Sequence, residues 1–301
     1  TFFSPEMRRS NMPRDGSNMV ATDDTLFVSI GGECIALDAQ TGLRRLSIQT
    51  PKDREVGWAS ATNKQLLTTT VRPGSEYRAD VGEWYDAAKK ASEIARMVSD
   101  SLVSHDSVTG KKQWSYQGGA VMNSTITSAE EIIYFVESRN ANLSQSAKSR
   151  IAPAELTSQY LVALNSVSGE KLWEKPVDFS KCENMLYLIH AEGTLVVSGS
   201  DQNKHYHIYA YDVSSPALRF GTENPEIPEL WRESATGSDK DRKRFTHHGG
   251  HLQHPLVVGQ TLYSDWRAFD LRSGDRKKDI TVPPRRGCGN MAASNHSMFY
   301  R

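Results

Sequence analysis

One short motif occurs five times along the chain and fixes the spacing of the whole sequence. Each copy has a small residue, any residue, then Asp or Asn, and four positions later Gly. The Asp or Asn positions are Asp38, Asp106, Asn165, Asp212 and Asp270. The glycines are Gly42, Gly110, Gly169 and Gly274, and Pro216 stands in the fourth copy where Gly is expected. Four copies are therefore complete and one is degenerate.

The residue types in the motif suit two strands joined by a tight turn. Apolar β-formers such as Val162 and Leu164 precede the Asp or Asn. The Asp or Asn side chain can accept hydrogen bonds from the amides of the turn, and Gly adopts a positive φ at little cost. Four residues after the Gly stand Trp114 and Trp173, whose large aromatic side chains we expect to act as packing anchors.

The distance between copies predicts the size of the repeating unit. The intervals from position 38 to 106, 165, 212 and 270 are 68, 59, 47 and 58 residues. Such a length holds about four short strands with their turns, which is one blade of a β-propeller. We therefore expect an all-β, single-domain propeller over residues 1–301 with four-stranded antiparallel blades. The expected blades cover residues 19–50, 56–117, 119–178, 184–234 and 250–283, with part of a sixth over 285–301.

Two copies carry a resemblance to a known family. ALDAQTG at 36–42 and ALNSVSGEKLW at 163–173 resemble the repeat of PQQ-like, or quinoprotein-type, β-propellers, Ala-x-Asp-x-x-Thr-Gly-x-x-x-Trp. The sequence QHP at 253–255 is similar to planctomycete-type PQQ-like proteins of undefined function. The resemblance implies a ring of seven or eight blades, of which this chain is a fragment or which its N-terminal strands close. It also implies a periplasmic or extracellular location.

One segment departs from the strand pattern. The sequence of residues 83–98, EWYDAAKKASEIARMV, has apolar residues along one stripe of a helix: Trp84, Ala88, Ala91, Ile94 or Ala95, and Val98. We expect an amphipathic helix inserted between strands. It would pack on the rim of the propeller or, alternatively, dock a partner.

Composition excludes several classes of partner. The chain has 36 basic and 36 acidic residues, so no overall charge attracts it to nucleic acid or anionic lipid. It has no apolar run near eighteen residues, and we expect no transmembrane segment. The three cysteines, Cys34, Cys182 and Cys288, show no spacing typical of zinc or redox motifs.

A histidine-rich stretch offers the strongest candidate for metal chemistry. THHGGHLQHP at 246–255 contains His247, His251 and His254, and imidazoles bind divalent transition metals. His205 and His207, one blade earlier, could converge with them on the same ion. The alternative is a polar loop whose histidines bond to backbone and water.

Three functions from different classes are consistent with the sequence. The first, which we favour, is a binding or scaffolding propeller that resembles the outer-membrane assembly lipoprotein and takes a protein or carbohydrate partner. The second is a quinoprotein oxidoreductase; resemblance to PQQ-dependent dehydrogenases implies PQQ with Ca²⁺ and a vicinal disulfide, and no adjacent cysteines are present. The third is a metal-dependent carbohydrate-active enzyme that uses the histidine-rich loop. No catalytic or quinone-binding residue is assigned.

Overall fold

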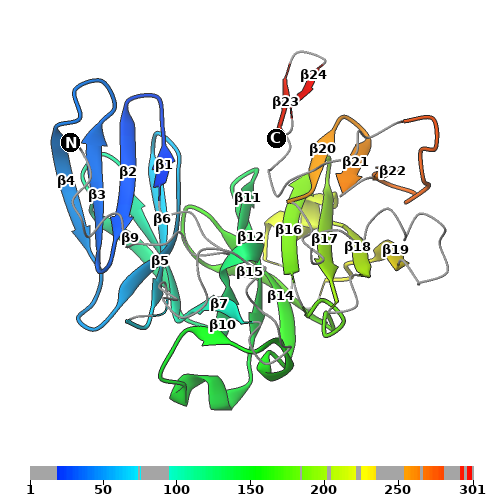
Figure 1. Cartoon of the computed structure of the whole chain (residues 1–301), viewed down its shortest axis with the longest axis horizontal. Helices are drawn as coiled ribbons and strands as arrows, with labels where there is room; N and C mark the ends of the chain where they lie inside the picture. Colours follow the sequence, from blue (N-terminus) through cyan, green and yellow to red (C-terminus); the bar gives the residue numbers. More distant parts are fainter. Residues whose placement is uncertain are drawn as a thin grey trace.

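Antiparallel sheets follow one another along the chain in this computed structural model (Figure 1). The structure describes residues 19–73, 75, 95–183, 185–201, 205–221, 225–234, 254–264, 267–280, 292–294 and 297–299. Within these ranges the regular elements are strands and short 3₁₀ turns. The predicted all-β class with four-stranded antiparallel propeller blades is confirmed.

Three sheets have four strands in simple sequential order. The first contains β1 (Met19–Ala21), β2 (Thr25–Ile30), β3 (Glu33–Asp38) and β4 (Arg44–Gln49). The second contains β5 (Glu55–Ala61), β6 (Gln65–Val71), β8 (Ser101–Asp106) and β9 (Lys112–Tyr116). The fourth contains β16 (Met185–Ala191), β17 (Thr194–Ser200), β18 (Tyr206–Asp212) and β19 (Glu229–Ser234).

The remaining sheets are less regular. The third sheet contains β10 (Ala120–Met122), β11 (Thr127–Ala129), β12 (Ile132–Ser138), β14 (Gln159–Asn165) and β15 (Lys171–Val177), and is extended by β7 (Arg96–Ser99) and β13 (Arg150–Ile151). The fifth sheet contains β20 (Leu256–Val258), β21 (Thr261–Ser264) and β22 (Arg267–Asp270). A hairpin of β23 (Ala292–Ser294) and β24 (Ser297–Phe299) follows it.

The helix expected over residues 83–98 is wrong at its C-terminal end. Residues 83–94 lie outside the described part of the chain, whereas residues 96–98 belong to strand β7. Val98 pairs with Met122, and Met97 pairs with Arg150. All four residues of β7 are buried. Pairing with distant strands therefore overrides the local helical periodicity.

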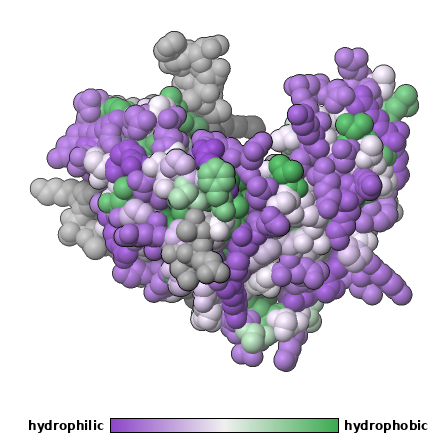
Figure 2. Space-filling view, turned by 180° about the vertical axis from the view of Figure 1, so that it is seen from behind, coloured by the Kyte–Doolittle hydropathy of each residue, from purple (hydrophilic) through white to green (hydrophobic). Residues whose placement is uncertain are grey.

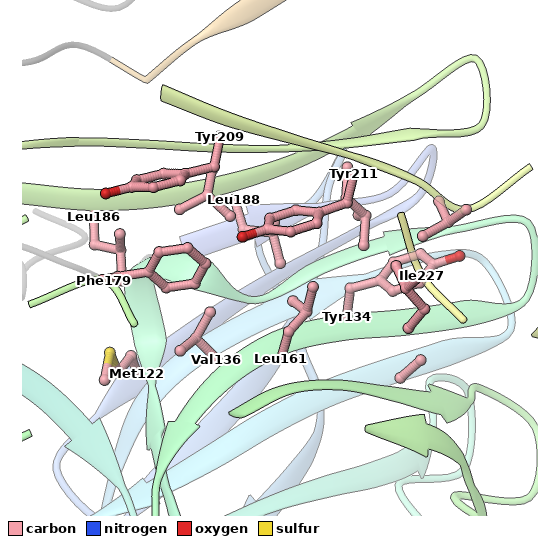
Figure 3. Packing of buried hydrophobic residues seen from close by; sticks show 14 of the residues in the cluster. Met122, Tyr134, Val136, Leu161, Phe179, Leu186, Leu188, Tyr209, Tyr211 and Ile227 are labelled. Atoms are coloured by element: carbon pink, nitrogen blue, oxygen red, sulfur yellow. The ribbon is translucent and has the colours of Figure 1, made fainter. Parts of the chain in front are cut away.

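The largest core cluster lies between the third and fourth sheets. Side chains alternate along a strand, so one face of each sheet can turn toward its neighbour. Tyr134, Val136 and Leu161 of the third sheet meet Leu186 and Leu188 of the fourth (Figure 3). A second cluster, which includes Leu102, Phe135 and Val162, joins the second and third sheets. Each blade is thus stabilised by the blade beside it.

In its four complete copies the repeated motif forms a tight turn, closed by a hydrogen bond from the Gly amide to the carbonyl of the Asp or Asn. Asp38 Oδ1 accepts hydrogen bonds from Thr41 N at 2.7 Å and Thr41 Oγ1 at 2.8 Å, and Asp106 and Asn165 accept equivalent bonds from their own turns. Gly42 has a φ of 71° and Gly274 a φ of 75°, the left-handed region that glycine adopts without strain.

Anchor residues sit opposite the small residue of the motif, next to a bulge. The pairs are Ala36 with Leu46, Ser104 with Trp114, Ala163 with Trp173 and Ala210 with Trp231. Trp231 is therefore the anchor of the degenerate fourth copy. The spacing of the motif does not predict Trp231 as an anchor, because the connection between Asp212 and Glu229 is longer than the turns of the other copies.

Two of these anchors dock onto the turn of the following blade. Trp114 Nε1 donates to Ser166 O at 2.9 Å, and Trp231 Nε1 donates to Leu271 O at 3.0 Å. A Cβ added to Gly169 would lie 2.5 Å from the Trp114 ring, so this turn needs glycine for close approach as well as for its φ.

The third anchor, Trp173, belongs to β15, which contacts the 3₁₀ turn η6 (Pro216–Arg219) of the degenerate copy, and it shares a core cluster with Leu218 of that turn. Its Nε1 is buried and has no hydrogen-bond partner among the described residues. The loss of the regular turn in the fourth copy thus coincides with the loss of this hydrogen bond.

Candidate functional site

A cleft of about 310 Å³ lies between the outer strand of the third sheet and the outer strands of the fourth. This volume is at the lower end of the range of ligand-binding pockets, roughly 300–1,000 Å³. Its lining residues are Lys175, Pro176, Val177, Asp178, Lys181, Tyr209, Tyr211, Glu229 and Arg232. We call this the interblade cleft.

Strand alternation explains one wall of the interblade cleft. Tyr209 and Tyr211 are two residues apart on β18, so their side chains leave the same face of the sheet. On the neighbouring strand β19, Arg232 pairs with Tyr209 and Glu229 pairs with Tyr211. Figure 3 shows the two tyrosine rings side by side above Phe179, with their hydroxyls toward the same side.

The segment that follows β15 holds these rings in place. Phe179 is 1% exposed, and its ring centroid lies 5.1 Å from that of Tyr209 and 6.5 Å from that of Tyr211. The Phe179 amide donates to Gln159 Oε1 at 2.8 Å, and the Cys182 amide donates to Phe179 O at 2.9 Å. The wall of the interblade cleft is therefore fixed before any ligand arrives.

Both tyrosines present neutral hydroxyl groups. Burial raises the pKa of Tyr209 to about 12 and raises the pKa of Tyr211 as well. Both phenols therefore stay protonated at physiological pH and can donate hydrogen bonds. No hydrogen bond joins either hydroxyl to another described residue.

The charged residues of the interblade cleft fall into two groups. Arg232 donates two hydrogen bonds to the Glu229 carboxylate, at 2.6 and 2.7 Å, and the Asp178 carboxylate accepts from Ser180 N at 2.9 Å. Both acidic residues therefore already accept hydrogen bonds within the protein. Lys175 and Lys181, by contrast, form no ion pair within the described ranges. With three basic and two acidic side chains, the lining of the interblade cleft has a net positive charge.

A cluster of polar side chains lies at the N-terminal end of β18, where His207 is on the same face as Tyr209 and Tyr211. His207 Nδ1 lies 3.0 Å from Ser234 Oγ, and His205 Nδ1 lies 2.9 Å from Asp201 Oδ2. His207 Nε2 is 3.7 Å from the same carboxylate, which is too far for a hydrogen bond. These residues therefore do not form a Ser-His-Asp relay. Burial lowers the pKa of His207, which keeps its imidazole neutral at physiological pH.

Of the three histidines predicted to bind a metal ion, only His254 lies in the described part of the chain. His247 and His251 lie outside the described residues, whereas His254 places its Nδ1 3.3 Å from Pro255 O and its ring centroid 4.9 Å from that of Tyr187. Over the described ranges, no group of three or more His, Cys, Asp or Glu side chains is placed to hold a metal ion. The site formed by the three histidines stays a prediction.

Sequence reasoning did not identify the interblade cleft. The alternation of Tyr209 and Tyr211 was visible but suggested only a strand, and nothing marked Lys175 or Lys181 as different from other surface lysines. The signal that could have found it is the pairing of an aromatic strand face with a Pro- and Lys-containing segment one blade earlier.

Comparison with known proteins agrees with this architecture. The family model PQQ_2, described as outer membrane protein assembly factor BamB, matches residues 7–279. This chain belongs to the PQQ_2 family. The resemblance predicted from the ALDAQTG and ALNSVSGEKLW motifs is thus confirmed. The search among curated proteins gives no match.

Several solved structures are similar to this PQQ_2 chain at low sequence identity. A complex of KlAtg21 with the coiled-coil of AgAtg16 matches with a TM-score of 0.57 at 8% identity, covering 94% of this chain and 76% of that one. BamB from Moraxella catarrhalis matches with a TM-score of 0.45 at 14% identity, covering 95% and 79%. A europium-containing methanol dehydrogenase matches with a TM-score of 0.46 at 11% identity, covering 87% and 51%.

No helix in the described part of this PQQ_2 chain has the length and apolar character needed to cross a membrane.

Proposed function

We propose that this PQQ_2 propeller is a binding or scaffolding module that acts outside the cytoplasm and takes a protein partner. The observation that carries the proposal is the interblade cleft, which is lined by two tyrosines with neutral hydroxyls and by two lysines that form no close ion pair with the described residues. The family's description as an outer membrane protein assembly factor supports both the type of partner and the compartment.

The chemistry of the interblade cleft suits a protein surface. Tyrosine and arginine are enriched at protein interfaces, since each combines a large contact area with a polar end. Arg232 lies over the ring of Tyr209, with 5.4 Å between its Cζ and the ring centroid. Because Phe179 already fixes the tyrosines, binding needs little further ordering of this wall.

The rest of the visible surface favours recognition through polar groups. On the face shown in Figure 2, hydrophobic residues form small, separate patches on a mainly hydrophilic surface. The exposed large hydrophobic residues of the described chain are Met19, Leu43, Val108, Val167, Phe220 and Val258. Such scattered apolar side chains are ordinary for a protein surface and mark no single apolar docking face.

The two enzymatic alternatives, a quinoprotein using PQQ with Ca²⁺ and a metal-dependent carbohydrate-active enzyme, stay predictions of the sequence. Titration of the purified protein with PQQ and Ca²⁺ separates the first from a scaffold by the visible spectrum of the bound quinone. Loss of a carbohydrate-cleaving activity in the His251→Ala variant would identify the second.

Site-specific photo-crosslinking in the source cells tests the proposal. The photoreactive residue replaces Pro176, which is exposed at the cleft, or Lys111, an exposed control position beside Gly110 in the second sheet. We expect a discrete protein adduct from position 176 and none from position 111. Fractionation of the same cells should place the adduct outside the cytoplasm. Equal labelling from both positions, or a cytoplasmic adduct, would contradict the proposal.

A further inference from the structure

The interblade cleft presents an excess of hydrogen-bond donors. The ammonium groups of Lys175 and Lys181 and the hydroxyls of Tyr209 and Tyr211 form no hydrogen bond or close ion pair with a described residue, although Lys181 is near enough to Asp178 to lower the pKa of that carboxyl. Both carboxylates of the same cleft already accept hydrogen bonds within the protein, Glu229 from Arg232 and Asp178 from Ser180. A ligand that complements this surface must bring acceptors and negative charge.

We propose that the interblade cleft binds an acidic segment of the partner protein, whose Asp or Glu carboxylates pair with Lys175 and Lys181 and accept hydrogen bonds from Tyr209 and Tyr211. This inference rests on the proposed function, because it names the chemistry of the partner at the same cleft. Charge-assisted hydrogen bonds to carboxylates are about twice as strong as neutral ones.

The two acidic residues of the interblade cleft do not prevent this binding. The charge of Glu229 is balanced by Arg232, to which it is joined by two hydrogen bonds. Hydrogen bonds from Ser180, together with the charge of Lys181, hold the pKa of Asp178 below its usual range, so its carboxylate is ionised and already accepts a hydrogen bond within its own turn. Three basic and two acidic side chains line the interblade cleft, so the entering carboxylate meets a lining with a net positive charge.

The apolar part of the lining suits the stem of an acidic side chain. Pro176 and Val177 line the cleft beside the lysines, and the tyrosine rings form the opposite wall. Methylene groups can pack there while the carboxylate reaches the donors. Because the cleft holds only about 310 Å³, we expect it to accept one or two side chains of an extended segment.

Fluorescence anisotropy with a labelled, capped peptide of ten glutamates tests this inference, with the matching peptide of ten glutamines as the reference. We expect the glutamate peptide to bind at least about tenfold more tightly than the glutamine peptide. Raising the salt concentration should weaken its binding, since the pairs are partly exposed. Equal affinity for the two peptides would overturn the inference.

Substitutions locate the binding to the interblade cleft. Lys175→Gln combined with Lys181→Gln should weaken glutamate-peptide binding by about tenfold, and the double Arg variant should retain it. Lys171→Gln is the matched control, because Lys171 lies on the same strand but is ion-paired with Glu174 at 2.5 Å. Tyr209→Phe, which keeps the ring, should weaken binding by a few-fold. Unchanged binding in the double Gln variant would overturn the inference.

The two proposals fail in distinguishable ways. If the crosslink from position 176 forms but the glutamate peptide does not bind, the protein-binding function stands and the acidic character of the partner is wrong. If the glutamate peptide binds through the two lysines but no protein adduct forms in cells, the site has the inferred chemistry and the proposed function is wrong.

Discussion

Replacement of the tryptophan anchors by phenylalanine separates the hydrogen bond of an anchor from its packing. Trp114→Phe and Trp173→Phe remove the same volume from two buried positions that are equivalent in the repeat. Trp114 loses its bond to Ser166 O, whereas Trp173 has no such bond to lose within the described structure. The two variants should therefore differ in stability even though their substitution is identical.

The size of the difference follows from the environment of each indole. A buried hydrogen bond contributes about 1 kcal/mol, and Ser166 O keeps a second donor, Gln65 Nε2 at 2.6 Å, when Trp114 is replaced. A buried donor without a partner costs about 1–3 kcal/mol, which Trp173→Phe removes. If the two sites lose similar packing, the free energy of unfolding should be about 2–4 kcal/mol lower in Trp114→Phe than in Trp173→Phe.

Urea unfolding followed by circular dichroism measures this difference. The slope of free energy against urea should be the same in both variants, which shows that the same surface unfolds. A lower stability for Trp173→Phe than for Trp114→Phe would refute the assignment of docked and undocked anchors.

Three further predictions concern the same framework. Trp231→Phe should lower the free energy of unfolding as Trp114→Phe does, by about 1 kcal/mol beyond the loss of packing, because the bond to Leu271 O disappears; urea unfolding beside Trp173→Phe checks it. Gly169→Ala should cost about 1–3 kcal/mol more than Gly31→Ala, since both have positive φ but only Gly169 meets a tryptophan ring, and open space surrounds Gly31; thermal unfolding of the two variants gives the difference. Glu174 should contribute to acid sensitivity, because hydrogen bonds from the Arg139 guanidinium lower its pKa from an ordinary value of 4.5 to about 2. This stabilisation is fully present above pH 4.5 and is lost as pH falls toward 2, so Glu174→Gln should flatten the stability profile over that window.

The turns of the repeat could be predicted from sequence because their chemistry is local. Asp38 binds amides two and three residues away, and Gly42 needs only its own φ. Spacing between such turns then sets the size of a blade. The family and the propeller class followed from these positions alone.

Features that depend on distant partners could not be predicted in this way. Strand β7 continues a helical pattern, yet its pairing partners Met122 and Arg150 lie far along the chain. Trp231 falls at an unexpected spacing because the hairpin before it is enlarged. The interblade cleft combines two blades, so neither Lys181 nor Tyr209 reveals it alone.

Photo-crosslinking from position 176 in the source cells is the most direct test of a protein-binding function at the interblade cleft. The account predicts a discrete protein adduct that is absent from the control position 111 and is reduced when Lys175 and Lys181 are both replaced by Gln. An adduct that forms equally from both positions, or no adduct from position 176, would contradict the account.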